Sequence, residues 1–172
     1  MLRAALNLWN DLIAKPRKLG PVRWPVLHKR PDAEWGVCLD VPIFKQVDGF
    51  SCGVVAGWTV IRTFDPDATR ADFERFYGLC NPHLIRGLST TALVRALRWE
   101  GIRVSLRRKH LPFSELNAEI CSGFPIIACI DRSGEGYAHW VTVYGYENKP
   151  DEDRRVYLAN LSDWWIDGEA VM

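Results

Sequence analysis

Apolar residues recur at helical spacing through the middle of the chain. After Cys52 they occupy the i, i+1, i+4 and i+7 positions, namely Val54, Val55, Trp58 and Ile61. This period predicts a helix with Ser51 as its N-cap, although the β-branched residues and Gly57 favour a strand. We therefore expect a helix that holds Cys52 in its first turn.

Three further helices are predicted downstream. The first begins at Thr69, which has the spacing of a capping box with Asp72. The second has Ser89 as its N-cap and ends at Gly101, because glycine adopts the left-handed conformation that closes many helices. A short helix over 114–121 follows.

The C-terminal half changes to patterns that are typical of strands. Residues 102–106 alternate between apolar and polar, which predicts a half-exposed strand, and 124–131 resembles a buried strand. The segments 138–147 and 155–161 predict the last two strands, joined as a hairpin, and a short strand is expected within 37–44. Helices followed by a run of antiparallel strands predict an α+β fold, with a helical lobe packed on an antiparallel sheet.

The first 36 residues differ from the rest. A helix that Pro16 ends is predicted by the helical spacing of Leu2, Leu6, Trp9 and Ile13. The stretch from there to residue 36 is rich in Pro, Arg and Trp and indicates an extended arm or an irregular connection. We therefore expect an N-terminal helix and arm over 1–36 and one domain over 37–172.

Composition narrows the class of protein. A chain of 172 residues with 48% hydrophobic residues is long enough for one domain with a sizeable core. Its net charge of +1 gives no electrostatic reason to expect nucleic acid as a partner. No apolar run is long enough to span a bilayer, and no signal peptide is evident. We expect a cytoplasmic protein without stable membrane insertion, and the sequence leaves its oligomeric state open.

The chain contains five cysteines at irregular spacing. An odd count without a signal peptide argues against a disulfide framework, and no pair of cysteines has the spacing of a zinc site. We expect Cys121 and Cys129 to be small buried hydrophobic residues. No metal or other cofactor is expected.

The last two strands bring polar residues together if their hairpin is symmetric about the Lys149–Pro150 bond. In that register Val143 faces Val156, and His139 faces Asn160 at the open end. Opposed side chains on one face of such a ribbon are close enough to form a hydrogen bond. A bulge in the loop would shift this register.

These residues have the chemistry of a thiol nucleophile. The first turn of a helix stabilises the thiolate of Cys52, His139 can hold its proton, and Asn160 can orient the imidazole. A tetrahedral oxyanion needs donors, which the backbone N–H of Cys52 and the side-chain amide of Gln46 can supply. Gly53 leaves room for a substrate backbone.

The stretch "KQVDGFSCG" (45–53) and the strand "HWVTVYGY" (139–146), followed by a strand that ends in an Asn, resemble the papain-like cysteine peptidases. The likeness is strongest to the bacteriocin-processing, or double-glycine, peptidases and to free-standing domains like them. It covers roughly residues 40–165. It implies a papain-like fold and a Cys52–His139–Asn160 triad with Gln46 at the oxyanion.

The chain departs from that group in several places. Ser51 stands where the group usually has an acidic residue, and Asn160 stands where an Asp followed by Pro is frequent. Asp163 is an alternative residue to orient His139. No transporter is attached, so the leader-peptide substrate of the bacteriocin systems does not carry over.

The resemblance implies a cysteine peptidase that cleaves a peptide or amide bond through a thioester, with Gly53 and Trp140 in contact with a peptide or protein substrate. One alternative is acyl transfer to an amine, as in a transglutaminase, by the same residues. Another is a catalytically silent domain that binds peptides.

Overall fold

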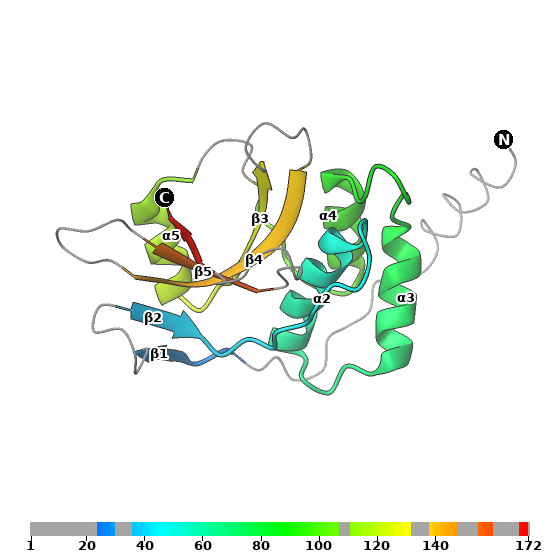
Figure 1. Ribbon diagram of the computed structural model, residues 1–172. Coiled ribbons are helices and arrows are strands. Elements are labelled where there is room, and N and C mark those ends of the chain that lie inside the picture. Colours follow the sequence, from blue (N-terminus) through cyan, green and yellow to red (C-terminus); the bar gives the residue numbers. More distant parts are fainter. Residues whose placement is uncertain are drawn as a thin grey trace, which may run out of the picture.

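The computed structural model describes residues 24–29, 36–106, 111–131, 138–147, 155–159 and 169–171. Its helices are α2 (Cys52–Phe64), α3 (Arg70–Cys80), α4 (Thr90–Trp99) and α5 (Phe113–Cys121). Its strands are β1 (Leu27–Lys29), β2 (Gly36–Leu39), β3 (Ile126–Asp131), β4 (Ala138–Glu147), β5 (Arg155–Ala159) and β6 (Glu169–Val171). Helices α2, α3 and α4 form a lobe at one side of the sheet, and α5 lies at the other side (Figure 1).

Strand β4 is the spine of an antiparallel sheet. In the described residues the strand order is β1-β2-β4-β5-β6, and β3 also pairs with β4. Strand β3 pairs with the first part of β4, from Asp131↔Ala138 to Ile126↔Val143. Strand β2 pairs with the last part of β4, from Gly145 onwards. The predicted α+β arrangement is therefore confirmed.

The predictions of the helices after residue 51 are confirmed together with most of their caps. The Thr69 side chain accepts from the Asp72 backbone N–H, and the Asp72 carboxylate accepts from the Thr69 backbone N–H, which completes a capping box on α3. The Ser89 hydroxyl accepts from the Ala92 N–H at the start of α4. Gly101 has a φ of 85° just after α4, where only glycine adopts such a conformation without strain.

Two hydrophobic cores lie on the two faces of β4. One is formed by α2, α3 and α4, and Trp140 packs against it. The other is formed by α5 and the sheet, and it contains Val141 and Val143. Alternation along β4 therefore sends neighbouring side chains into different cores.

The structure corrects one strand prediction and adds two strands that were not predicted. Residues 102–106 form no strand in the described structure. Their alternation instead reflects a segment that lays Ile102 and Val104 on the helical core. The short strand expected within 37–44 is present as β2, which ends at Leu39. Finally, β1 lies inside the segment expected to be an arm, and β6 was not predicted.

Two expectations about cysteines are wrong. Cys121 is exposed at the end of α5, where its sulfur lies 3.1 Å from the Asn117 side-chain oxygen. Cys129 is exposed on β3. Cys80, in contrast, is buried in the helical core. All five cysteines are among the described residues, and none forms a disulfide.

The register of the last hairpin also differs from the prediction. Val143 lies opposite Leu158 rather than Val156, and the register shifts between Val143 and Gly145 in a β-bulge. A Cβ on Gly145 would lie 2.5 Å from the Val37 carbonyl oxygen, so β2 approaches β4 as closely as only glycine permits. The predicted N-terminal helix, Asn160 and Asp163 lie outside the described residues.

We predict that Gly145→Ala destabilises the protein by about 2 kcal/mol or more, because its nearest contact is backbone that cannot swing aside. The matched control is Gly78→Ala in α3, where nothing lies within 4 Å of the new Cβ. That change should stabilise the helix by about 0.5–1 kcal/mol. Urea denaturation followed by circular dichroism measures both, and equal effects of the two substitutions would contradict this account of the bulge.

Candidate functional site

A loop that folds onto itself determines where α2 begins. The Asp48 carboxylate accepts the backbone N–H groups of Phe50 at 2.9 Å and Ser51 at 2.7 Å. The Ser51 carbonyl accepts the N–H groups of Val54 and Val55, so the helix starts at Cys52. Ser51 is the N-cap residue as predicted, but its hydroxyl makes no capping bond to the helix. The carboxylate of Asp48 organises this turn instead.

Hydrogen bonds hold α2 and its neighbouring loop against β4. The Thr142 hydroxyl donates to the Ala56 carbonyl at 3.1 Å, and both groups are buried. The Trp140 indole N–H donates to the Leu88 carbonyl at 3.0 Å. Together these contacts seat the first turn of α2 beside residue 140 of the sheet.

The Cys52 sulfur consequently faces the backbone of β4. Only 7% of Cys52 is exposed. Burial raises the pKa of its thiol, whereas hydrogen bonds from the backbone N–H groups of Trp140, Gly53 and Cys52 itself lower that pKa, and the Asp48 carboxylate raises it. The net direction is upward, so the helix start alone does not make Cys52 a thiolate.

His139 immediately precedes the N–H that faces the sulfur. It is half-buried on β4, opposite Ile130 of β3, and its Nε2 atom is shielded from solvent. The structure thus brings Cys52 next to the His139–Trp140 peptide. Because side chains alternate along β4, Trp140 lies on the α2 side, and the His139 side chain starts from the α5 side.

Gln46 is buried on the loop that enters α2, with 6% of its surface exposed. Its side-chain nitrogen donates to the Asp48 carbonyl at 2.5 Å. Its Oε1 atom is buried and accepts no hydrogen bond from the described residues. Burial raises the pKa of the Asp48 carboxylate, but hydrogen bonds, one of them from the Gln46 side chain, lower that pKa overall, so the amide of Gln46 is engaged with Asp48.

Gly53 does not leave room for a substrate backbone. A Cβ there would lie 3.0 Å from both Leu88 Cδ2 and Trp140 Cδ1, so the protein's own side chains fill that space. The glycine is needed for the close approach between α2, the Leu88 loop and β4. Trp140 also connects β4 to the Leu88 loop, because its indole N–H donates to the Leu88 carbonyl.

Sequence reasoning missed two residues that build the site. Asp48 directs the turn before Cys52, and the signal for it was the Asp–Gly pair in "VDGFS", which is typical of an Asx-type turn. Leu88 contacts both Gly53 and Trp140. No local sequence pattern predicts the role of Leu88, because that role depends on contacts with residues far away in the sequence.

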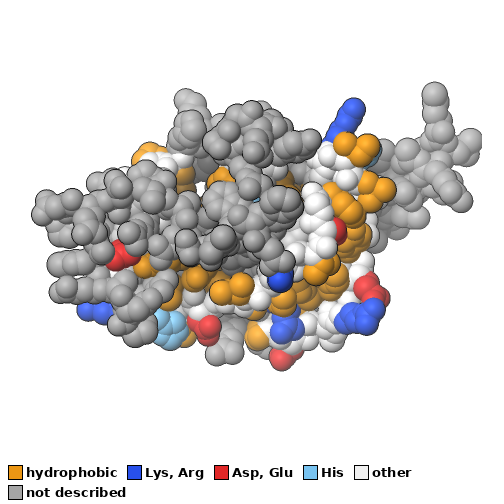
Figure 2. All heavy atoms as spheres, in the orientation of Figure 1, with side chains coloured by type: hydrophobic (Ala, Val, Ile, Leu, Met, Phe, Trp, Pro, Cys, Tyr) orange, Lys and Arg blue, Asp and Glu red, His pale blue; other side chains and the backbone are white. Residues whose placement is uncertain are grey.

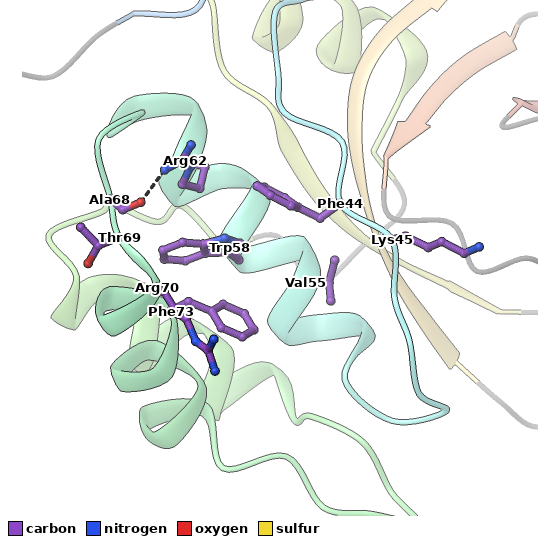
Figure 3. A pocket seen from close by; sticks show the side chains of 9 residues that line it. All are labelled: Phe44, Lys45, Val55, Trp58, Arg62, Ala68, Thr69, Arg70 and Phe73. Carbon is purple, nitrogen blue, oxygen red and sulfur yellow. Dashed lines mark hydrogen bonds between the residues drawn. The ribbon is translucent and has the colours of Figure 1, made fainter.

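A hollow lies on the flank of α2, and neither Cys52 nor His139 lines it. It measures about 380 Å³, and its lining residues are Phe44, Lys45, Val55, Trp58, Arg62, Ala68, Thr69, Arg70 and Phe73. Figure 3 shows the rings of Phe44, Trp58 and Phe73 gathered around it, with Arg62 bonded to the Ala68 carbonyl. Figure 2 shows hydrophobic side chains at the surface over the same lobe.

The chain matches no family model, no curated protein and no solved structure. The described residues contain no group of three or more His, Cys, Asp or Glu side chains that could hold a metal ion. In the same part of the chain, no helix has the length and apolar character needed to cross a bilayer. What the protein does has to be inferred from the geometry around Cys52.

We predict that Asp48→Asn moves the pH midpoint of Cys52 alkylation by iodoacetamide to a lower value. The asparagine oxygen still accepts from Phe50 and Ser51, but the negative charge that raises the pKa of Cys52 is gone. Labelling rates from pH 5 to 10, read by mass spectrometry, measure the midpoint. Asp40→Asn, at an exposed position on the same approach to α2, should leave it unchanged. A midpoint that stays in place or rises in Asp48→Asn would contradict the assignment.

Proposed function

We propose that the protein is a thiol-dependent hydrolase, a cysteine peptidase of papain-like fold that cleaves a peptide or amide bond. The observation that supports this most is the position of Cys52. It is the first residue of α2, and its sulfur faces the backbone N–H of the residue that follows His139. A buried cysteine with a purely structural role would require neither the adjacent histidine nor the amides directed at its sulfur.

The raised pKa of Cys52 makes a neighbouring base necessary. A thiol whose pKa is raised by burial is a poor nucleophile at neutral pH unless an adjacent group takes its proton. His139 is the candidate base, because its peptide group adjoins the N–H that faces the sulfur, and this role requires its imidazole to turn from the α5 side of β4 toward Cys52. Asn160 would orient that imidazole, and Asp163 is the alternative residue for this role.

The reaction follows from these assignments. The Cys52 proton passes to His139, and the thiolate attacks the carbonyl carbon of the substrate. The oxyanion accepts the Cys52 N–H, and the side-chain amide of Gln46 is the proposed second donor. The C–N bond then breaks, the amine leaves with the proton from His139, and a thioester remains. Water, deprotonated by His139, releases the acid and regenerates the thiol.

An extended peptide or protein segment is the substrate class that suits this site, between the helical lobe and the sheet. The proposed chemistry uses no cofactor and no nucleic-acid partner. We also place the enzyme in a reducing compartment such as the cytoplasm, because its nucleophile must remain a thiol. Transfer of the acyl group to an amine would use the same residues, and product analysis with an added amine separates transfer from hydrolysis.

We predict that iodoacetamide at pH 7 labels Cys52 faster than the exposed Cys129, although Cys52 is buried. Cys80 should not react, because burial and the Glu100 charge raise its pKa to about 12. His139→Ala should slow the labelling of Cys52 at least about tenfold, since it removes the base. Peptide mapping by mass spectrometry measures each site separately.

The control is His83→Ala, which removes an exposed histidine outside the proposed triad. It should leave the labelling of Cys52 unchanged. Labelling of Cys52 no faster than that of Cys129, or insensitive to His139→Ala, would refute the proposed function.

A further inference from the structure

We propose that the hollow on the flank of α2 binds a small carboxylic acid with an apolar body, of the kind represented by an aryl-substituted propionate. Neither Cys52 nor His139 lines this hollow, so the site is separate from the proposed peptidase site. Its volume of about 380 Å³ lies at the lower end of the range for ligand pockets, about 300–1,000 Å³. Its aromatic wall and one unpaired guanidinium define the ligand.

Three aromatic rings form the apolar wall of the hollow. Trp58 comes from α2, Phe73 from α3, and Phe44 from the segment that leads into α2 (Figure 3). Phe73 meets Trp58 edge to face with ring centroids 5.2 Å apart, and only 7% of Trp58 is exposed. Trp58 packs in turn on Phe76 of the helical core. The wall is therefore ordered during folding, and an apolar ligand group gains hydrophobic free energy there at little further entropic cost.

Arg62 supplies the polar end of the hollow. It lies one turn after Trp58 on α2, and its Nη1 atom donates to the Ala68 carbonyl, which fixes the guanidinium at the end of the hollow (Figure 3). Its Nε atom is shielded from solvent and has no hydrogen-bond partner among the described residues. An unsatisfied buried donor is unfavourable, and more so on a charged group. The hydrogen-bonding capacity of Arg62 is thus only partly used within the protein.

The charge of Arg62 is also uncompensated, in contrast to two arginines of α3. Arg70 pairs with Glu74 at 2.9 Å, and Arg75 pairs with Glu100 at 2.9 Å. Arg62 is half-buried, yet it forms no ion pair with any carboxylate of the described part of the chain. The described residues that line the hollow include no acidic side chain. A ligand that carries a negative charge would supply what the protein does not.

The charge balance of the hollow favours a single carboxylate. Lys45 and Arg70 also line it, but both are exposed, so water and salt screen their charges. Arg62 is therefore the main cation, and its planar guanidinium suits the two oxygens of one carboxylate. A doubly charged phosphate would lose more hydration beside three aromatic rings than one guanidinium can offset. The expected ligand carries one carboxylate and one aromatic or branched aliphatic group.

Titration of the full chain with hydrocinnamate, followed by amide NMR spectra, tests this directly. Signals of Val55, the Trp58 indole and the Arg62 Nε–H should shift and saturate with a Kd of about 1 mM or below, as expected for a ligand of this size. Hydrocinnamyl alcohol lacks the charge and propionate lacks the ring, and each should bind at least about tenfold more weakly.

Two matched variants assign the charge to Arg62. Arg62→Gln should remove the difference in affinity between hydrocinnamate and its alcohol. Arg98→Gln is the control, because Arg98 also lies in the last turn of its helix and donates to a backbone carbonyl, that of Val104, but does not line the hollow. The preference for the acid should persist in Arg98→Gln. The ratio of the two affinities is measured within each protein, so a small loss of stability in a variant does not alter it.

The inference is overturned if hydrocinnamate produces no saturable shift at the hollow of the parent protein, or if the acid and the alcohol bind equally well there. It is also overturned if the preference for the acid survives in Arg62→Gln or disappears in Arg98→Gln. Iodoacetamide labelling of Cys52 tests the proposed function separately, so either proposal can fail without the other.

Discussion

The contact between α2 and β4 is the constraint on which the rest of the structure depends. The buried hydrogen bond from the Thr142 hydroxyl to the Ala56 carbonyl joins the middle of the helix to the middle of the strand. One turn earlier, Gly53 lets Leu88 and Trp140 close on the helix start. With both contacts in place, the Cys52 sulfur meets the Trp140 N–H and not the interior of either core. Any reaction at Cys52 depends on this position of α2 against β4.

The contact between α2 and β4 also affects the reactivity of Cys52, because it buries the thiol and at the same time brings backbone N–H groups to its sulfur. Cys80 and Cys52 are both buried and belong to the same helical lobe. The Cys80 sulfur is packed among apolar side chains, and burial and the Glu100 charge raise its pKa. Cys52 differs because three backbone N–H groups face its sulfur, although burial still raises its pKa overall. Such a site is suited to a thiol that loses its proton only to an adjacent base.

Local signals predicted the elements that build the site, because each is encoded by residues close together in the sequence. The capping box of Thr69 and Asp72, the Ser89 cap and the bounds of β4 were all predictable on that basis. The predictions that were wrong concern features that depend on residues far apart in the sequence. The hairpin register is set by the approach of β2 to Gly145, and the space beside Gly53 is filled by Leu88 from another segment. Exposure of Cys129 follows from the arrangement of strands around β3, which its apolar neighbours in sequence do not reveal.

The central claim is that the Cys52 sulfur and the His139 imidazole form one proton-sharing pair. An NMR titration of the His139 ring in the intact protein and in Cys52→Ala tests it most directly, because coupled groups change each other's titration. The account predicts that His139 stays protonated to higher pH in the intact protein than in the variant, since a neighbouring thiolate stabilises the imidazolium. Identical titration curves for His139 in the two proteins would contradict it.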